Sequence, residues 1–177
     1  MRRALTAALF TAMLVLAAPA TARADLTAFI GATSEPGPRF TRGLAVGFGL
    51  IIVGFEFEWS SAPGHGRDVA GCAFLGDECE PSLTTGMANV LLQTPRAVLP
   101  VQLYGTVGAG FYREHFRAGV AEADRRETNV GTNVGGGIKM ELLGPLRLRV
   151  DYRVFRLSGD AVYRTPQRFY VGLNVAF

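Results

Sequence analysis

The chain has 177 residues, 49% of them hydrophobic, and a formal net charge of +3, a size suited to one domain. Three of its 18 basic residues, Arg2, Arg3 and Arg23, lie in an amino-terminal segment that reads as removable, which leaves 15 basic residues against 15 acidic ones. The sequence pI of about 9.2 therefore belongs mainly to the precursor, and it does not indicate a nucleic-acid-binding surface.

The amino terminus has the features of a secretory signal. Two arginines precede an apolar run over 4–18, and Ala22 and Ala24 give the small-x-small pattern that signal peptidase accepts. Cleavage after Ala24 would leave residues 25–177 as the mature domain. A retained transmembrane helix is the alternative, but the apolar run is shorter than the roughly 18 residues that such a helix needs.

The mature region alternates extended segments with turns and loops. The clearest two-residue period places Phe55, Phe57 and Trp59 opposite small or acidic residues, and a helix would scatter these side chains around its axis. In chain order the predicted strands cover residues 26–33, 42–49, 53–60, 84–94, 100–116, 128–142, 146–154 and 167–177.

The connections between these strands alternate in length. Those after the first, third, fifth and seventh strands are mostly long, whereas the reversals after the second, fourth and sixth are short. A membrane barrel with both termini in the periplasm has long external loops, short periplasmic turns and an even number of strands. The sequence therefore predicts an all-β fold, an eight-stranded antiparallel up-and-down transmembrane β-barrel.

The last strand is long enough, at roughly ten residues, to cross a bilayer when tilted. The residues on one of its faces are Phe169, Val171, Leu173, Val175 and Phe177. This strand resembles the terminal strand of bacterial outer-membrane β-barrels, whose final Phe is read by the assembly machinery. The resemblance implies export to the bacterial outer membrane, with the assembly machinery, the lipid bilayer and lipopolysaccharide as partners.

The resemblance extends over the mature chain. The alternating run 54–58, a cysteine-bearing loop, the glycines at 135–137 and the strand around 147–149 look like the OmpA/OmpX-like and opacity-porin-like barrels. Those families imply a structural or surface-interaction role, with a narrow porin-like conduit for small solutes or apolar compounds as the alternative. A soluble, lipocalin-like binding barrel is a further alternative, because alternation alone does not say which face points inward.

The polar faces of the predicted strands carry equal numbers of acids and bases. These residues are Glu56, Glu58, Glu114, Glu141 and Asp151 with Lys139, Arg147, Arg149, Arg153 and Arg168. Unpaired charges in a tight interior are costly, so the balance predicts ion pairs that plug the lumen. We expect Arg147 and Arg149 to pair with Glu56 and Glu58.

Bulky aromatic residues lie near the ends of the opposite, apolar faces. Trp59, Phe111 and Phe169 fall near the external strand ends, and Phe177 falls at the periplasmic end. Outer-membrane barrels carry aromatic girdles at both membrane interfaces. These four residues are therefore the predicted girdle.

The long loop after the third strand contains the two cysteines of the chain, Cys72 and Cys79. In an exported protein this spacing favours a disulfide, and two free thiols are the alternative. The acidic residues of this loop lack the spacing of an EF-hand, so no calcium site is predicted. They are Asp68, Asp77, Glu78 and Glu80.

Neither catalysis nor a cofactor is predicted. His65 and His115 are the histidines of the chain, and His115 has the outward parity of its strand. A lipid A deacylase-like barrel would place a Ser two residues further on, where this chain has Arg117.

The arginines in and beside the loop that follows the fifth strand could contact lipopolysaccharide phosphates, or the loop could simply be solvated. They are Arg113, Arg117, Arg125 and Arg126.

Overall fold

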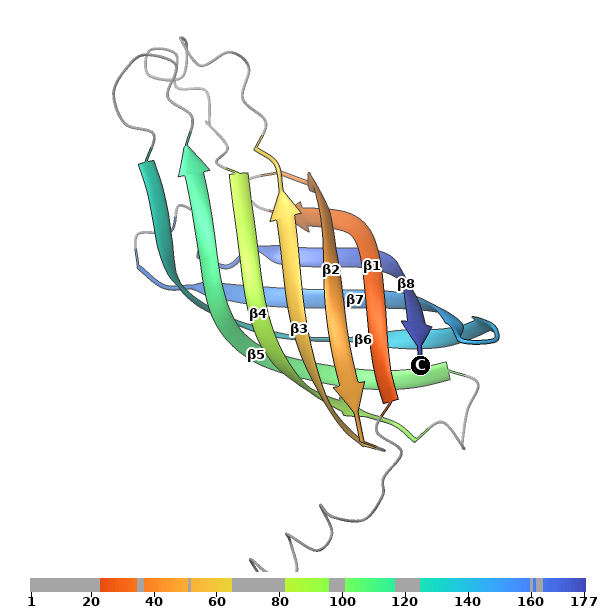
Figure 1. The fold of residues 1–177 in the computed structure, drawn as a ribbon. Coiled ribbons are helices and arrows are strands. Elements are labelled where there is room, and N and C mark those ends of the chain that lie inside the picture. Colours follow the sequence, from red (N-terminus) through yellow and green to blue (C-terminus); the bar gives the residue numbers. More distant parts are fainter. Residues whose placement is uncertain are drawn as a thin grey trace, which may run out of the picture.

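In a computed structural model the chain forms one closed barrel, and the structure describes residues 23–34, 37–50, 52–64, 82–95, 101–116, 125–159, 161 and 164–177. The strands within these ranges are β1 (Arg23–Ser34), β2 (Arg39–Gly49), β3 (Val53–Ala62), β4 (Ser82–Gln93), β5 (Val101–Phe116), β6 (Arg125–Leu143), β7 (Leu146–Leu157) and β8 (Gln167–Ala176). Each strand pairs antiparallel with the next, and β1 pairs with β8 to close the barrel (Figure 1). The predicted eight-stranded up-and-down barrel is confirmed.

Several strands extend further than predicted toward the end of the barrel where β1, β3, β5 and β7 finish, here called the loop end. β6 begins at Arg125, so Arg126 pairs with His115 of β5, and β7 continues to Leu157. Main-chain hydrogen bonding does not depend on side-chain polarity, so a ladder can continue past the apolar pattern. Hydropathy alone therefore made these strands too short at the loop end.

The opposite end, here called the turn end, holds the short reversals and the carboxy terminus. The turn between β6 and β7 uses Gly144 at φ +58°, a left-handed conformation that glycine adopts without the strain of a Cβ atom. The Ala176 amide donates a hydrogen bond to the Pro145 carbonyl (3.0 Å). This contact holds the turn against the end of β8.

β1 also begins at the turn end. Ala24 exchanges two backbone hydrogen bonds with Phe177, with N–O distances of 3.0 and 2.9 Å. Ala22 and the rest of the predicted signal before it lie outside the described residues, so cleavage after Ala24 stays a prediction. If that cleavage occurs, the pair of Asp25 with Ala176 becomes the first of the β1–β8 ladder.

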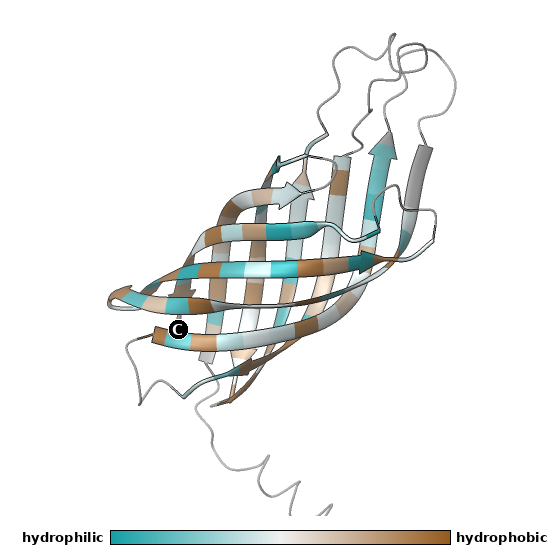
Figure 2. Ribbon diagram, turned by 180° about the vertical axis from the view of Figure 1, so that it is seen from behind, coloured by the Kyte–Doolittle hydropathy of each residue, from teal (hydrophilic) through white to brown (hydrophobic). Residues whose placement is uncertain are grey.

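The strands turn their apolar faces outward and their polar faces into the barrel. Phe57 and Val134 are each 59% exposed, whereas Arg149 and Asp151 are fully buried. Figure 2 shows the same alternation of hydrophilic and hydrophobic residues along the strands. This orientation is that of a transmembrane barrel, and it excludes the inverted, lipocalin-like arrangement, in which the apolar face would point inward.

Among the described residues, no helix is both long enough and apolar enough to cross a membrane.

Candidate functional site

The middle of the lumen holds a compact cluster of six buried charges, here called the lumen cluster. It contains three guanidinium groups and three carboxylates: Arg149, Arg153, Arg168, Glu56, Glu58 and Asp151. The carboxylates come from β3 and β7, and the guanidinium groups come from β7 and β8. Because the two signs are equal in number, the lumen cluster has a net charge of zero.

Arg153 lies at the centre of the lumen cluster and reaches all three carboxylates. Its Nη2 donates to Glu56 Oε1 (2.7 Å), and its Nε donates to Asp151 Oδ1 (2.9 Å). Its Nη1 forms an ion pair with Glu58 Oε2 (3.1 Å). One side chain therefore joins the β3 wall of the barrel to the β7 wall.

Arg149 extends the network toward the turn end. It forms ion pairs with Glu56 and with Asp151, the second with an N–O distance of 3.0 Å. Its Nε also donates to the hydroxyl oxygen of Tyr104 (2.7 Å), and that hydroxyl donates to Asp151. Tyr104 on β5 thus links the lumen cluster to a third wall of the barrel.

Arg168 completes the cluster on the side of the loop end. It forms an ion pair with Glu58, and its Nη1 donates to Ser60 Oγ (2.6 Å). The guanidinium carbon lies 4.7 Å from the centre of the Phe155 ring and 5.3 Å from that of Phe29. Cation–π contacts of this kind stabilise a desolvated arginine.

The predicted partners of the two glutamates were half right. Arg149 does contact Glu56, but Glu58 contacts Arg153 and Arg168 instead of Arg147. Arg147 is buried nearer to the turn end, beyond the lumen cluster. The partners differ because β3 and β7 lie on different walls, so the closure of the barrel sets which of their residues meet.

The other predicted lumen charges lie outside this cluster. Lys139 Nζ donates to Asp25 Oδ2 (2.9 Å), a partner that sequence reasoning missed. Glu114 is buried near the loop end, whereas Glu141 is exposed next to the turn between β6 and β7. The short turn that follows Glu141 holds it at the mouth of the barrel, where water reaches the carboxylate.

An apolar layer fills the lumen between the lumen cluster and the loop end. It consists of Ala62, Leu83, Met87, Tyr112, Phe155 and Leu157, and Ala161 packs against it. These residues alternate along their strands with the same inward direction as the charged ones, so the lumen contains an apolar level that the sequence analysis did not predict. The apolar layer and the lumen cluster therefore occupy successive levels along the barrel axis.

Within the described residues, no three potential metal ligands gather, and the charges of the lumen cluster compensate one another. The arrangement is a neutral network of buried ion pairs. It brings no nucleophile and base together among the residues that line it.

The sequence of the chain matches no protein-family model and no curated protein. Its structure does match solved proteins. Neisserial surface protein A, NspA, aligns over 88% of this chain and 96% of its own, with 15% identity and a TM-score of 0.64. Ail, the attachment invasion locus protein of Yersinia pestis, was solved in complex with a heparin analogue. It aligns over 88% of this chain and 99% of its own, with 12% identity and a TM-score of 0.56. The outer membrane enzyme PagL aligns over 85% of this chain and 98% of its own, with 12% identity and a TM-score of 0.51.

The chain has the fold of the small outer-membrane β-barrels. At these identities the likeness concerns the fold, so function has to be argued from the residues themselves.

The predicted girdle residues of this outer-membrane barrel fold all face outward. Trp59, Phe111 and Phe169 are each about half exposed, and Phe177 is more so at 74%. The first three lie toward the loop end, and Phe177 lies at the turn end. That they form aromatic belts at the two membrane interfaces stays a prediction.

The outward face of β8 carries the five residues of the predicted assembly signal. Each alternates with a buried lumen residue, from Arg168 through Tyr170 to Asn174. The exposed residues are Phe169, Val171, Leu173, Val175 and Phe177. The outward face of the strand is therefore a continuous apolar stripe that ends on an aromatic ring.

His115 has a serine opposite it that the sequence did not reveal. Ser82 of β4 is the register partner of His115, and its hydroxyl oxygen lies 3.4 Å from the His115 carbonyl oxygen. The Ser82 hydroxyl therefore donates to the main chain of His115. The pair is a consequence of register, which neighbouring sequence positions cannot show.

Other predictions fall outside the described residues. They concern the disulfide between Cys72 and Cys79 and the loop residues Asp68, Asp77, Glu78, Glu80, His65 and Arg117. Of Arg125 and Arg126, only the main chain in β6 is described.

Proposed function

We propose that this protein is a closed barrel of the bacterial outer membrane, exported through a cleaved signal, with a structural or surface-interaction role and without enzymatic activity. The charge-neutral lumen cluster carries this proposal. Arg153 spans from β7 to β3 across the interior, and the apolar layer covers the cluster on the side of the loop end. Eight strands leave an interior only wide enough for side chains to fill, so these two layers occupy the path that a solute would need.

The surface role is supported by the exposed parts of the barrel and by the proteins that share its fold. The matched NspA is a surface protein, and the matched Ail is an attachment invasion locus protein. A plugged barrel has no transport task, which leaves its loop end and its outward face as the parts that can contact partners. The expected partners in the envelope are the bilayer, lipopolysaccharide and the assembly machinery.

The purified, folded protein should give no stepwise currents in planar lipid bilayers. The control is the double variant Glu56→Ser/Arg149→Ser, which removes one charge of each sign and so keeps the lumen cluster neutral while shortening two side chains. Insertion of both proteins is verified from the faster gel migration of the unheated, folded form. Reproducible current steps from the wild-type protein would contradict the plug.

A narrow conduit is the second candidate, and a specific observation favours it. The side-chain oxygens Thr106 Oγ1, Asn133 Oδ1 and Asn174 Oδ1 are buried in the lumen and accept no hydrogen bond from a described protein group. Buried polar atoms are normally satisfied, often by water. Wild-type currents that disappear when Asn133 is replaced by Leu would support this candidate over the plug.

Assembly should depend on the last residue of the chain. Replacing Phe177 with Ala should lower the amount of folded protein in the outer membrane, because the ring belongs to the predicted assembly signal. The matched control is Phe48→Ala, which removes another exposed aromatic ring near the turn end. Cell fractionation followed by gel migration of unheated samples measures the effect, and equal yields for the two variants would refute the role of Phe177.

A further inference from the structure

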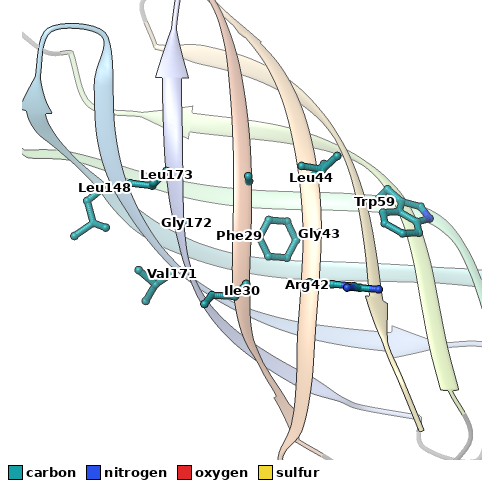
Figure 3. Close-up of a pocket in the computed structure, with 11 residues that line it drawn as sticks. Phe29, Ile30, Arg42, Gly43, Leu44, Trp59, Leu148, Val171, Gly172 and Leu173 are labelled. Carbon is teal, nitrogen blue, oxygen red and sulfur yellow. The ribbon is translucent and has the colours of Figure 1, made fainter.

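A groove of about 500 Å³ crosses the outward face of the barrel over β8, β1 and β2 (Figure 3). It arises where a small side chain lies between large ones. Ala28 of β1 is the register partner of Leu44 on β2 and of Leu173 on β8, and Leu44 is in turn the partner of Trp59. Alanine is too short to fill the space between its neighbours, so an apolar hollow is left.

The floor of the groove is formed from inside the barrel. The Phe29 ring lies under Gly43 of β2, where an added Cβ atom would be only 2.3 Å from the Phe29 Cζ atom. The ring also stacks on Tyr170 with a centroid distance of 4.0 Å, which fixes it in place. The groove therefore has a rigid aromatic floor, and its volume lies within the range of about 300–1,000 Å³ that is usual for ligand sites.

A single charge borders this groove. Arg42 of β2 is exposed on the outward face, and its register partners are Ile30 and Ser61. Figure 3 shows its side chain extending from β2 toward the side of the groove where Trp59 lies. Because Phe40 lies further toward the loop end and is 51% exposed, Arg42 lies within the apolar band instead of beyond it.

In the part of the chain that the structure describes, no acidic side chain faces outward to neutralise Arg42. Among the described strand residues, the outward-facing charges toward the loop end are Arg42, Arg113 and Arg156, and no described Asp or Glu faces outward. A guanidinium in a lipid environment is costly unless an anion accompanies it. The surface thus offers one cation and one apolar hollow side by side, with Trp59 at the level of the interface.

We propose that the groove binds one phosphate-bearing lipid of the outer leaflet. Its phosphate contacts the Arg42 guanidinium, whose planar donors match phosphate oxygens in pairs. One acyl chain lies over Ala28 and runs toward the turn end between Leu44 and Leu173. The proposal requires that the outward face lies in a bilayer, but it does not depend on whether the lumen conducts.

Trp59 is the one tryptophan of the chain, so its fluorescence reports on this groove. The full protein is reconstituted in phosphatidylcholine vesicles that contain either phosphatidic acid or phosphatidylcholine with brominated acyl chains. Bromine quenches tryptophan only at close range. Brominated phosphatidic acid should associate with the site about fivefold more tightly than brominated phosphatidylcholine, the preference that one surface arginine gives for an anionic lipid.

Two variants locate the site, and a third is the matched control. Arg42→Gln should reduce the fivefold preference to none, and Ala28→Leu should lower quenching by both lipids because it fills the groove. Arg113→Gln removes an outward arginine from β5 and should leave the preference unchanged. Folding of each variant is verified by gel migration, and Ala28→Leu tests the groove even where a change at Arg42 prevents folding.

Three outcomes would overturn the proposal. The first is equal quenching of the wild-type protein by the two lipids, and the second is an unchanged preference in Arg42→Gln. The third is quenching of Trp59 by a brominated fatty acid as strong as that by brominated phosphatidic acid, which would show that the site binds any anionic lipid and does not select phosphate. Inorganic phosphate in the buffer should not compete, and if it did, the anion site would be independent of the acyl chain.

Discussion

Arg153→Met is expected to lower the free energy of unfolding of the folded barrel by about 3–5 kcal/mol, the usual effect of breaking a buried ion pair. The guanidinium of Arg153 contacts Glu56, Glu58 and Asp151, and all three carboxylates are buried. Methionine is apolar and about as long as the aliphatic part of the arginine side chain, so the change removes the guanidinium group while keeping the packing of the rest of the side chain. The lumen cluster would then carry one uncompensated negative charge in a desolvated interior.

The measurement is the urea concentration at the midpoint of unfolding in lipid vesicles, supported by the temperature at which the folded gel band is lost. The matched control is Arg156→Met, which alters an exposed arginine of the same strand. Surface substitutions of this kind usually change stability by less than about 0.5 kcal/mol. Equal midpoints for the two variants would show that the ion pairs of the lumen cluster do not stabilise the barrel.

Gly137→Ala should destabilise the barrel by about 1–3 kcal/mol, the usual effect of overpacking. An added Cβ atom at Gly137 would lie 2.1 Å from the Val150 carbonyl oxygen and 2.5 Å from the Tyr104 hydroxyl oxygen. The first contact involves the main chain of β7, so a side-chain rotation cannot relieve it. The second would displace the hydroxyl that holds Asp151 and Arg149.

Gly105→Ala, a change of glycine to alanine in the same region, should not destabilise the barrel. A Cβ atom at Gly105 faces outward and would come no closer than 3.9 Å to its nearest neighbour, the Gly135 carbonyl oxygen. Because alanine restricts the unfolded chain more than glycine does, this change should be neutral or stabilising by about 0.4–1 kcal/mol. Chemical unfolding of both variants tests the pair, and a loss of stability at Gly105 as large as that at Gly137 would rule out the proposed clash.

The predicted strands and their faces followed from local patterns. Phe55, Phe57 and Trp59 alternate with Gly54, Glu56 and Glu58, and the structure turns the first set outward and the second inward. A two-residue period needs no knowledge of distant partners, because it follows from the geometry of an extended chain. The same reasoning explains why nine of the ten predicted lumen charges are buried, with Glu141 as the exception at the mouth of the barrel.

The partners inside the lumen could not be predicted in this way. Glu58 and Arg168 are 110 residues apart, and they meet because β1 and β8 close the barrel and bring β8 across from β3. The apolar layer was missed for a related reason. Met87 and Phe155 have the parity of the charged residues, and only their level along the barrel axis distinguishes them.

By itself, the sequence determined that the chain forms eight amphipathic strands joined alternately by short turns and longer loops, since alternation and loop lengths are properties of neighbouring residues. Only the tertiary structure decided that the apolar faces point outward, which charges neutralise one another, where the apolar layer lies in the lumen and where Ala28 leaves a groove beside Arg42. These features depend on the register and tilt with which the strands close, and that closure is a property of the whole barrel instead of any one strand.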